Sequence, residues 1–451
     1  MIFKRYLYQN YRVFYAVKSR FSRRLTRGGW LVLAAFFVTA ILGLDTNLSM
    51  SYQVFAFLFC LVLVAFISLW IARPRFAAER RLPRFGSAGE PIRYQIEMVN
   101  RSRFAQNGLT VLEEPGDPRP SFQQFLDTPE PGEERRNWYD RTYGYYRWSW
   151  LIEQNQRARL NEQPVPPLPA NGRVKFDAEL TPGRRGRLRL EGITVLCPDP
   201  FGLFRAFRRV PLPQSLLVLP KRYVIPHFEL PGKMQYQHGG VALASAVGES
   251  EEFVSLRDYR PGDSLRRIHW KSWAKTGKPI VKEFQDEFFV RHALILDTFS
   301  SIAQSAVFEE AVSVAASFAC TIRTQDSLLD LMFVGPQAFS FTAGRGVAQT
   351  EQILEILASV EICRDKPFRA LKHLVMEHVG SVSGCICILL EWDQERQKLI
   401  EDLLLLGMPV MVFVIAASEA TTPLDPGPLA ARPGSFRVLP AGKIAEALVQ
   451  L

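Results

Sequence analysis

The residues best suited to chemistry lie in the run RDYRPGDSLRRIHWKSWAKTGKPIVKEF, at 257–284. Eight lysines and arginines stand there against three acidic residues, with tryptophan and histidine among them. Guanidinium groups at this density suit the binding of phosphate or of a carboxylate-rich partner surface. The alternative is a solvated helix that packs through Ile268, Trp270 and Trp273. His269 is the one candidate acid or base, with no nucleophile or carboxylate partner identifiable beside it.

Turn and cap residues place this motif on a loop followed by a short helix. Pro261 and Gly262 are typical of a turn, Asp263 or Ser264 can cap a helix LRRIHWKSWAKT, and Gly277 ends that helix. We expect the motif to position or contact a partner or an anion through a set of charged and aromatic residues: Arg260, Asp263, Arg266, Arg267, His269, Trp270, Lys271 and Lys278.

Recognised catalytic patterns are missing from the rest of the chain. The Gly-Lys pair at 277–278 lacks the upstream glycine and the hydroxyl of a phosphate-binding loop, and neither G-x-S-x-G nor H-E-x-x-H occurs. His373 and His378 are five residues apart, which puts them about 140° apart on a helix and suits no shared metal. The sequence therefore predicts a non-enzymatic protein. A catalytic or anion-binding pocket on the basic motif, acting on an envelope precursor, remains the alternative.

Charge and cysteine usage exclude two broad classes of protein. Eight of the ten net positive charges fall in residues 1–27, which contain no acid, so the other 424 residues carry a net charge of only +2. That balance argues against a nucleic-acid binder. The spacing of the six cysteines matches neither a zinc site nor a compact disulfide framework, which favours reduced, buried thiols in the cytoplasm.

Two uncharged runs near the N-terminus predict a transmembrane hairpin. Residues 28–44 and 46–72 contain no charge, and each run is long enough to cross roughly 30 Å of hydrocarbon, the first only just. Core helices and a cleaved signal peptide are the alternatives. Cations precede the first run and follow the second, so the positive-inside rule puts both termini in the cytoplasm. The basic segment 1–27 mixes aromatics with cations, and we expect it to lie on an anionic lipid surface.

The periodicity of apolar residues divides the remaining chain into two folded regions joined by a linker. Period-two strands over 76–222 predict a β-sandwich, interrupted at about 115–170 by an aromatic insertion with one helix around 134–158. The insertion either meets membrane or partner or packs back onto the sandwich. Residues 223–289 hold a linker and the basic motif. Residues 290–451 alternate apolar strands with amphipathic helices, which predicts an α/β domain with a mostly parallel sheet.

Two long motifs carry a resemblance to a known family. The runs RRGRLRLEGITVLCPDPFGLFR and YRPGDSLRRIHWKSWAKTGKPIVKEFQDE resemble the bacterial family called "domain of unknown function 58" over most of residues 84–440. The resemblance implies a membrane hairpin, a β-sandwich and a von Willebrand factor A-type domain. It also implies work beside a MoxR-type AAA+ ATPase, with a transglutaminase-like membrane protein as a further partner.

An A-type domain implies a metal site of the pattern D-x-S-x-S at the carboxyl edge of its sheet. Asp297 and Ser301 match the ends of that pattern, but Phe299 replaces its first serine and offers no oxygen to a cation such as Mg²⁺. Asp393 can supply a later carboxylate. We therefore expect a degenerate, metal-free site in which Asp297 caps the following loop. A metal-dependent binding protein is the third functional alternative.

These observations together predict a membrane-tethered adaptor or scaffold in the bacterial inner membrane. It has two spans and cytoplasmic termini, and it partners a MoxR-type ATPase in the assembly or remodelling of membrane or envelope proteins.

Overall fold

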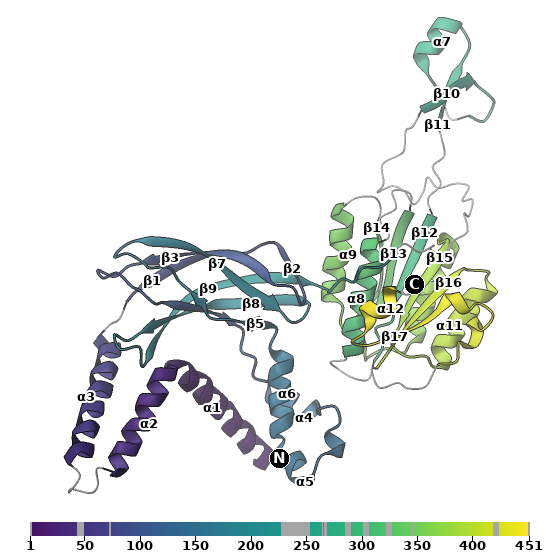
Figure 1. The fold of residues 1–451 in the computed structure, drawn as a ribbon. Helices are drawn as coiled ribbons and strands as arrows, with labels where there is room; N and C mark the ends of the chain where they lie inside the picture. The colour runs from purple at the N-terminus through teal and green to yellow at the C-terminus, as the bar shows by residue number, and fades with distance from the viewer. Residues whose placement is uncertain are drawn as a thin grey trace. The chain divides into compact units, whose positions relative to one another are not determined.

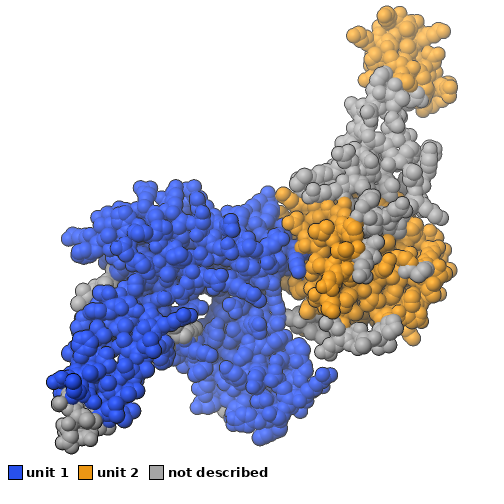
Figure 2. Space-filling view, in the orientation of Figure 1, with its two compact units in different colours: residues 1–221 blue, residues 222–451 orange. Residues whose placement is uncertain are grey.

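The structure is a computed structural model in which the chain divides into two compact units, Met1–Lys221 and Arg222–Leu451 (Figure 2). It describes residues 2–42, 49–71, 74–226, 253–263, 265, 268–284, 290–300, 306–321, 327–343, 347–417 and 424–449. Figure 1 labels the elements of both units.

Three helices begin the first unit: α1 (Ile2–Arg24), α2 (Arg27–Leu42) and α3 (Ser49–Ile71). The segment Met50–Ser68 of α3 is long and apolar enough to cross a membrane, with a mean hydropathy of 2.3. Only 6% of that segment is buried, which argues against the core-helix alternative. The 16 residues of α2 are apolar too but span about 24 Å, less than the hydrocarbon core. The Phe36 ring of α2 stacks on Phe55 of α3, with centroids 5.1 Å apart.

Two sheets pack over one core to form a sandwich. One sheet has the order β1-β3-β7-β5 and the other the order β2-β9-β8-β4-β6, with β2 and β9 parallel and the other pairs antiparallel. Alternation explains the core, because Ile92, Tyr94, Ile96 and Met98 of β3 point inward while the residues between them are at least partly exposed. The strands are β1 (Phe76–Arg81), β2 (Phe85–Ser87), β3 (Ile92–Asn100), β4 (Thr110–Pro115), β5 (Ala158–Leu160), β6 (Gln163–Pro164), β7 (Arg173–Pro182), β8 (Gly186–Pro198) and β9 (Arg205–Leu219).

The insertion between β4 and β5 is helical and packs on α1. Its elements are α4 (Phe122–Asp127), η1 (Glu133–Arg135), α5 (Trp138–Tyr143) and α6 (Tyr145–Asn155). The single helix expected around 134–158 is therefore wrong, because Gly144 takes a left-handed conformation (φ 64°) that ends α5 and starts α6 anew. Trp148 and Leu151 of α6 are buried in a cluster with tyrosines of α1.

The basic motif forms a small hairpin of its own, drawn at the top of Figure 1. β10 (Phe253–Asp258) and β11 (Ile280–Phe284) pair antiparallel, with α7 (Trp270–Thr276) between them. The helix begins five residues later than the sequence predicts. The reason is that Ile268 forms a β-bridge with Val281 and the backbone N–H of His269 donates to Ile280, so these two residues pair with β11 instead of continuing a helix. Gly277 ends the helix as predicted.

The rest of the second unit is an α/β domain whose six-stranded sheet has the order β14-β13-β12-β15-β16-β17. All neighbours are parallel except β14, which is antiparallel to β13. Ala293 and Ile295 of β12 face the core under α10 and α11, while Phe413 of β16 meets Phe318 of α8 at 4.9 Å between ring centroids. Helices thus cover both faces, as continuous apolar strands predict.

The bounds of this domain follow its sequence pattern closely. Its strands are β12 (Val290–Leu296), β13 (Ser327–Val334), β14 (Ala338–Ala343), β15 (Gly384–Leu389), β16 (Val410–Ala416) and β17 (Phe436–Pro440). Its helices are α8 (Ala306–Thr321), α9 (Val347–Ser359), α10 (Arg369–His378), η3 (Val379–Ser381), α11 (Gln394–Leu405), η4 (Gly427–Leu429), η5 (Pro433–Ser435) and α12 (Ile444–Val449).

Candidate functional site

Asp297 lies at the carboxyl edge of the parallel sheet, directly after β12, and is fully buried. Its Oδ1 accepts a hydrogen bond from the Phe299 N–H at 2.9 Å, the loop contact that the sequence predicts. Its Oδ2 accepts from the Leu390 N–H at 3.1 Å and from Arg396 Nε at 2.7 Å. Burial raises the pKa of the Asp297 carboxyl, while Arg396 and the two backbone N–H donors act to lower it.

Arg396 brings its positive charge to this edge from the first turn of α11. Its Nη1 donates to Asp393 at 2.7 Å, and its Nη2 donates to the Phe299 carbonyl at 3.1 Å. The guanidinium lies over the Phe368 ring, 4.8 Å from the centroid, and the side chain is only 5% exposed. Asp393 also caps α11 by accepting from the Arg396 N–H. A guanidinium therefore joins the two aspartates that the resemblance assigns to a metal.

This arrangement does not fit a bound Mg²⁺. The Asp297 oxygens are engaged by three donors, and Phe299 packs against Phe368 at 5.6 Å between ring centroids. Across the described residues, no group of three or more His, Cys, Asp or Glu side chains could hold a metal. Ser301 lies outside the described residues. The positive charge that the buried carboxylate requires comes from the chain itself.

In the basic hairpin, Asp263 acts within the turn. Its carboxylate accepts from Nη1 and Nη2 of Arg257, each at 2.8 Å, and from the Arg260 N–H at 2.8 Å. These hydrogen bonds lower the pKa of Asp263 to about 2. Gly262, with a φ of 108°, supplies the left-handed residue of the turn. Asp263 is thus a positioning residue of the turn and not the helix cap expected from the sequence, since α7 begins after His269 with no side-chain cap; Ser264, the other cap candidate, lies outside the described residues.

The outward surface of the hairpin is aromatic and cationic. Trp270 is 63% exposed and stacks on Trp273, with centroids 5.2 Å apart. Exposed cations accompany it: Arg260, Lys271, Lys275 and Lys278. The predicted residues Arg266 and Arg267 lie outside the described residues. We call these exposed residues of the hairpin, Arg260, Trp270, Lys271, Lys275 and Lys278, the hairpin face.

The histidines give no catalytic arrangement in the part of the chain that the structure describes. His269 is half-buried at the start of α7, and its Nδ1 lies 2.6 Å from Ser272 Oγ, which is a local contact within one turn. His373 is exposed beside Glu377, at 3.3 Å, and His378 Nδ1 contacts the Leu374 carbonyl one turn earlier.

A third site, which sequence reasoning missed, joins the helices to the sandwich. The turn 199–204 is held by Asp199, which accepts from the N–H groups of Phe204 at 2.8 Å and Phe201 at 3.3 Å. The Leu203 carbonyl of this turn accepts from the Thr26 N–H at 3.1 Å, between α1 and α2. A Cβ on Gly29 would lie 2.2 Å from the same oxygen, so only glycine fits there. Two features of the sequence could have indicated this contact: the turn-forming run Asp-Pro-Phe-Gly at 199–202 and the pair Gly28-Gly29 at the start of the first apolar run.

The fold and these sites define a protein with apolar N-terminal helices, a sandwich, a basic hairpin and an α/β domain closed by an arginine at its carboxyl edge. Residues 255–374, which include the hairpin, match the family described as "Protein of unknown function DUF58". The "Uncharacterized protein YeaD" of Bacillus subtilis is 28% identical over 182 residues, which cover 40% of this chain and 44% of that protein. Both findings support the assignment of the chain to the DUF58 family, as its motifs predicted.

Similarity to solved structures is weak. The CARDB domain of the PF1109 protein from Pyrococcus furiosus is 12% identical, with 32% of this chain and 93% of that chain covered and a TM-score of 0.17. A β-glucosidase from Listeria innocua is 13% identical, with 32% and 16% covered and a TM-score of 0.16. Scores this low carry no conclusion about fold or function.

Proposed function

We propose that the protein is a membrane-tethered, non-enzymatic adaptor whose hairpin face binds a cytoplasmic AAA+ ATPase of the MoxR type. The observation that carries this proposal is the hairpin face itself. Trp270 and its sequence neighbour Lys271 are exposed on α7, Arg260 is exposed in the preceding turn, and Asp263 holds that turn by accepting from Arg257 and from the Arg260 N–H. Tryptophan and arginine are the residues that most often dominate binding energy at protein interfaces. A complementary ATPase surface would offer carboxylates around an apolar recess.

The membrane attachment in this proposal consists of α2 and α3 as two spans, with both termini in the cytoplasm of a bacterial cell. It is supported by the span length of α3, by the contact of α2 with α3, and by the cations that precede α2. Through this attachment the adaptor would couple ATP-driven remodelling to an envelope client, for which a transglutaminase-like membrane protein is the candidate.

The α/β domain has a distinct role in the proposal, as an A-type domain that binds without metal. A-type binding through a shared cation needs open coordination positions on the metal. Arg396 fills that place between Asp297 and Asp393, so the domain would contact the ATPase or the client by protein surface alone. This arrangement counts against the metal-dependent alternative.

Affinity capture of the full-length, tagged protein tests the proposal. The protein is crosslinked briefly in membranes with and without ATP, gently solubilised and purified, and its partners are identified by mass spectrometry. We expect a MoxR-type ATPase whose recovery changes with nucleotide. Trp270→Ala with Lys271→Glu should remove it, whereas Lys443→Glu, an equal charge reversal on the exposed surface of the α/β domain, should not.

Three outcomes would count against the proposal. Recovery of no ATPase with intact protein would refute the adaptor role. Equal recovery with the hairpin variant would show that the hairpin face does not bind the ATPase. Turnover of a phosphate-bearing envelope precursor by the wild type, lost in His269→Ala, would instead establish the pocket alternative.

A further inference from the structure

Helix α1 has two different apolar surfaces, and the protein covers only one of them. On the covered side, the hydroxyl of Tyr8 donates to the Pro120 carbonyl at 3.0 Å and that of Tyr11 to the Tyr143 carbonyl at 3.2 Å. Both rings also contact Trp148, at centroid distances of 5.4 and 6.0 Å. The helical insertion therefore holds α1 in a fixed orientation about its own axis.

The other apolar side of α1 is open. Its members recur at helical spacing along one stripe and are each at least half exposed: Phe3, Tyr6, Val13, Phe14 and Val17. The stripe continues onto the insertion, because Phe3 meets Tyr143 of α5 at 6.0 Å and Tyr143 meets the exposed Tyr139 at 4.4 Å. We call this surface, formed by the stripe of α1 together with Tyr139 and Tyr143, the aromatic platform. A water-facing stripe of this length needs a partner.

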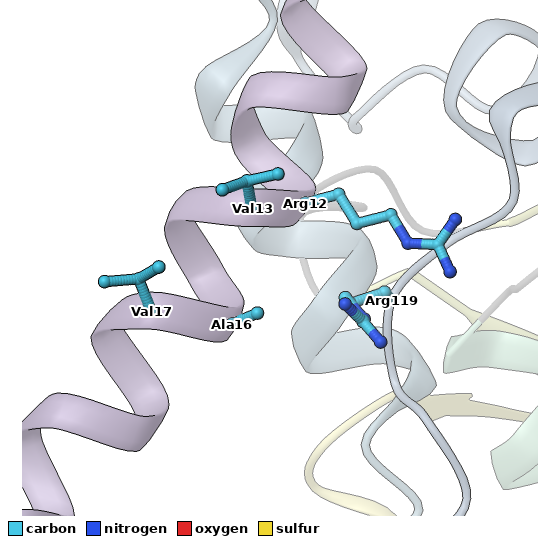
Figure 3. Close-up of a pocket in the computed structure, with 5 residues that line it drawn as sticks. All are labelled: Arg12, Val13, Ala16, Val17 and Arg119. Atoms are coloured by element: carbon cyan, nitrogen blue, oxygen red, sulfur yellow. The ribbon is translucent and has the colours of Figure 1, made fainter.

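The helix that carries most of the platform is basic throughout its sequence. α1 contains seven cations and no acid: Lys4, Arg5, Arg12, Lys18, Arg20, Arg23 and Arg24. Figure 3 shows Arg12 reaching across to the loop that carries Arg119, on the side of a hollow of about 240 Å³ that Val13 and Val17 also line. Asp117 pairs with Arg119 at 2.5 Å, and Arg12 also helps to lower the pKa of the Asp117 carboxyl, so two arginines stand against one carboxylate at the hollow. Aromatics beside cations match the boundary between acyl chains and anionic headgroups.

The chain path favours a lipid partner over a protein. α1 ends at Arg24 and α2 begins at Arg27, so only two residues lie between them. α2 packs on α3, the helix that is long and apolar enough to cross a membrane. A membrane that holds α3 would therefore start next to the last turn of α1. The platform is continuous along the chain with that membrane, and its charge is opposite to that of an anionic leaflet.

We propose that α1 and the helical insertion form one lipid-binding platform that lies on the anionic headgroup layer, with the hollow between Arg12 and Arg119 taking a lipid phosphate. This inference rests on the proposed membrane attachment and not on the ATPase. It assigns the aromatic insertion a role: it locks the tyrosine side of α1 so that the phenylalanine and valine side faces lipid. The platform would fix the height of the sandwich above the bilayer.

Site-specific photocrosslinking in the full-length protein tests the platform. A benzophenone amino acid replaces Phe14, on the open stripe, or Tyr15, which packs into the covered cluster as the matched control. The protein is placed in nanodiscs of phosphatidylcholine with phosphatidylglycerol, and adducts are identified by mass. We expect lipid adducts at position 14, enriched in phosphatidylglycerol, and none at position 15.

The charge contribution has its own variant. Arg12→Gln with Lys18→Gln should lower the enrichment of phosphatidylglycerol in the adducts about fivefold for each cation removed, because each lysine or arginine near an anionic surface contributes about 1 kcal/mol. Arg93→Gln, on an exposed sandwich position, should leave it unchanged.

A third crosslinker at Leu63 of α3 separates the two proposals. Lipid adducts at Leu63 but only protein adducts at position 14 would overturn the platform and leave the membrane attachment standing, with a second copy or another protein as occupant. Failure at both positions would overturn the attachment and the platform together. Equal lipid adducts at positions 14 and 15 would show that α1 is not held by the insertion, which also refutes the inference.

Discussion

Replacement of Arg396 by methionine should strongly destabilise the α/β domain, because this arginine is buried and supplies the cation that pairs with Asp297. Methionine keeps much of the side-chain volume but leaves the buried Asp297 with two backbone N–H donors and no cation. A hydrogen bond to a charged group is worth about 1.5–3 kcal/mol, and the lost contact with the Phe368 ring adds about 1 kcal/mol. The total agrees with the 3–5 kcal/mol typical of breaking one partner of a buried ion pair.

Amide hydrogen exchange in the intact protein measures this loss of stability within the α/β domain itself. Amides of β15 are fully buried at the centre of the sheet, so they exchange through opening of the domain. A loss of 3–5 kcal/mol should speed their exchange by roughly two to three and a half orders of magnitude, at about tenfold per 1.4 kcal/mol. Asp297→Asn should cost less, because Arg396 keeps Asp393 and the Phe299 carbonyl.

The stability lost in Arg396→Met should depend on pH. In Arg396→Met, burial still raises the pKa of Asp297 and the opposing cation is gone, so this pKa rises further. The folded variant then binds a proton more readily than the unfolded chain, which means that acid stabilises it. The deficit relative to wild type should shrink as the pH falls from 8 to 5. Unchanged exchange in β15, or a deficit independent of pH, would refute the account of the buried pair.

Three further predictions concern the other sites. Gly29→Ala should disturb the junction of α1 and α2 by about 1–3 kcal/mol through overpacking, seen as faster protease cleavage there, whereas Gly28→Ala, with no atom nearer than 3.8 Å, should not. In the sandwich, Arg80 of β1 forms a buried ion pair with Glu113 of β4, so Glu113→Gln should cost about 3–5 kcal/mol by leaving Arg80 buried without a carboxylate; β8 amides that exchange as in wild type would contradict this. Asp263→Ala should lower ATPase capture as far as loss of the hairpin tryptophan does. Because the pKa of the Asp263 carboxyl is lowered to about 2, its hydrogen bonds should hold the wild-type hairpin above pH 4 and be lost only as the pH drops toward 2. The rate of protease cleavage in the hairpin measures this loss.

Regular patterns made most of the second unit and the sandwich strands predictable. The apolar run at 384–392 and the alternating run at 91–100 correspond to β15 and β3, because burial on two faces or one face leaves a direct mark on the sequence. β14 and β17 were not predicted, because both are edge strands with few buried residues and so lack the continuous apolar run that marks β15. The start of α7 was misplaced because backbone pairing with β11 decides it, and residue preferences do not report such pairing.

The candidate sites were predictable only where their residues are neighbours in sequence. The turn that Asp263 closes involves partners three and six residues away, and the sequence indicated it. Arg396 meets Asp297 across 99 residues, and no local pattern marks an arginine that will stand where a cation is expected. The same holds for α1, whose aromatic content predicted a lipid surface but not which tyrosines the insertion would cover.

The junction at Leu25 and Thr26 has a mechanical consequence. Only these two residues separate α1 from α2, and both are bonded to the sandwich, Leu25 through a bridge to Phe204 and Thr26 through the Leu203 carbonyl. This junction is short and hydrogen-bonded, so it transmits motion, whereas a flexible random-coil linker would not. A force or torque applied to the sandwich would therefore act directly on α2 through these hydrogen bonds. The orientation of α2 would respond to strain in the sandwich.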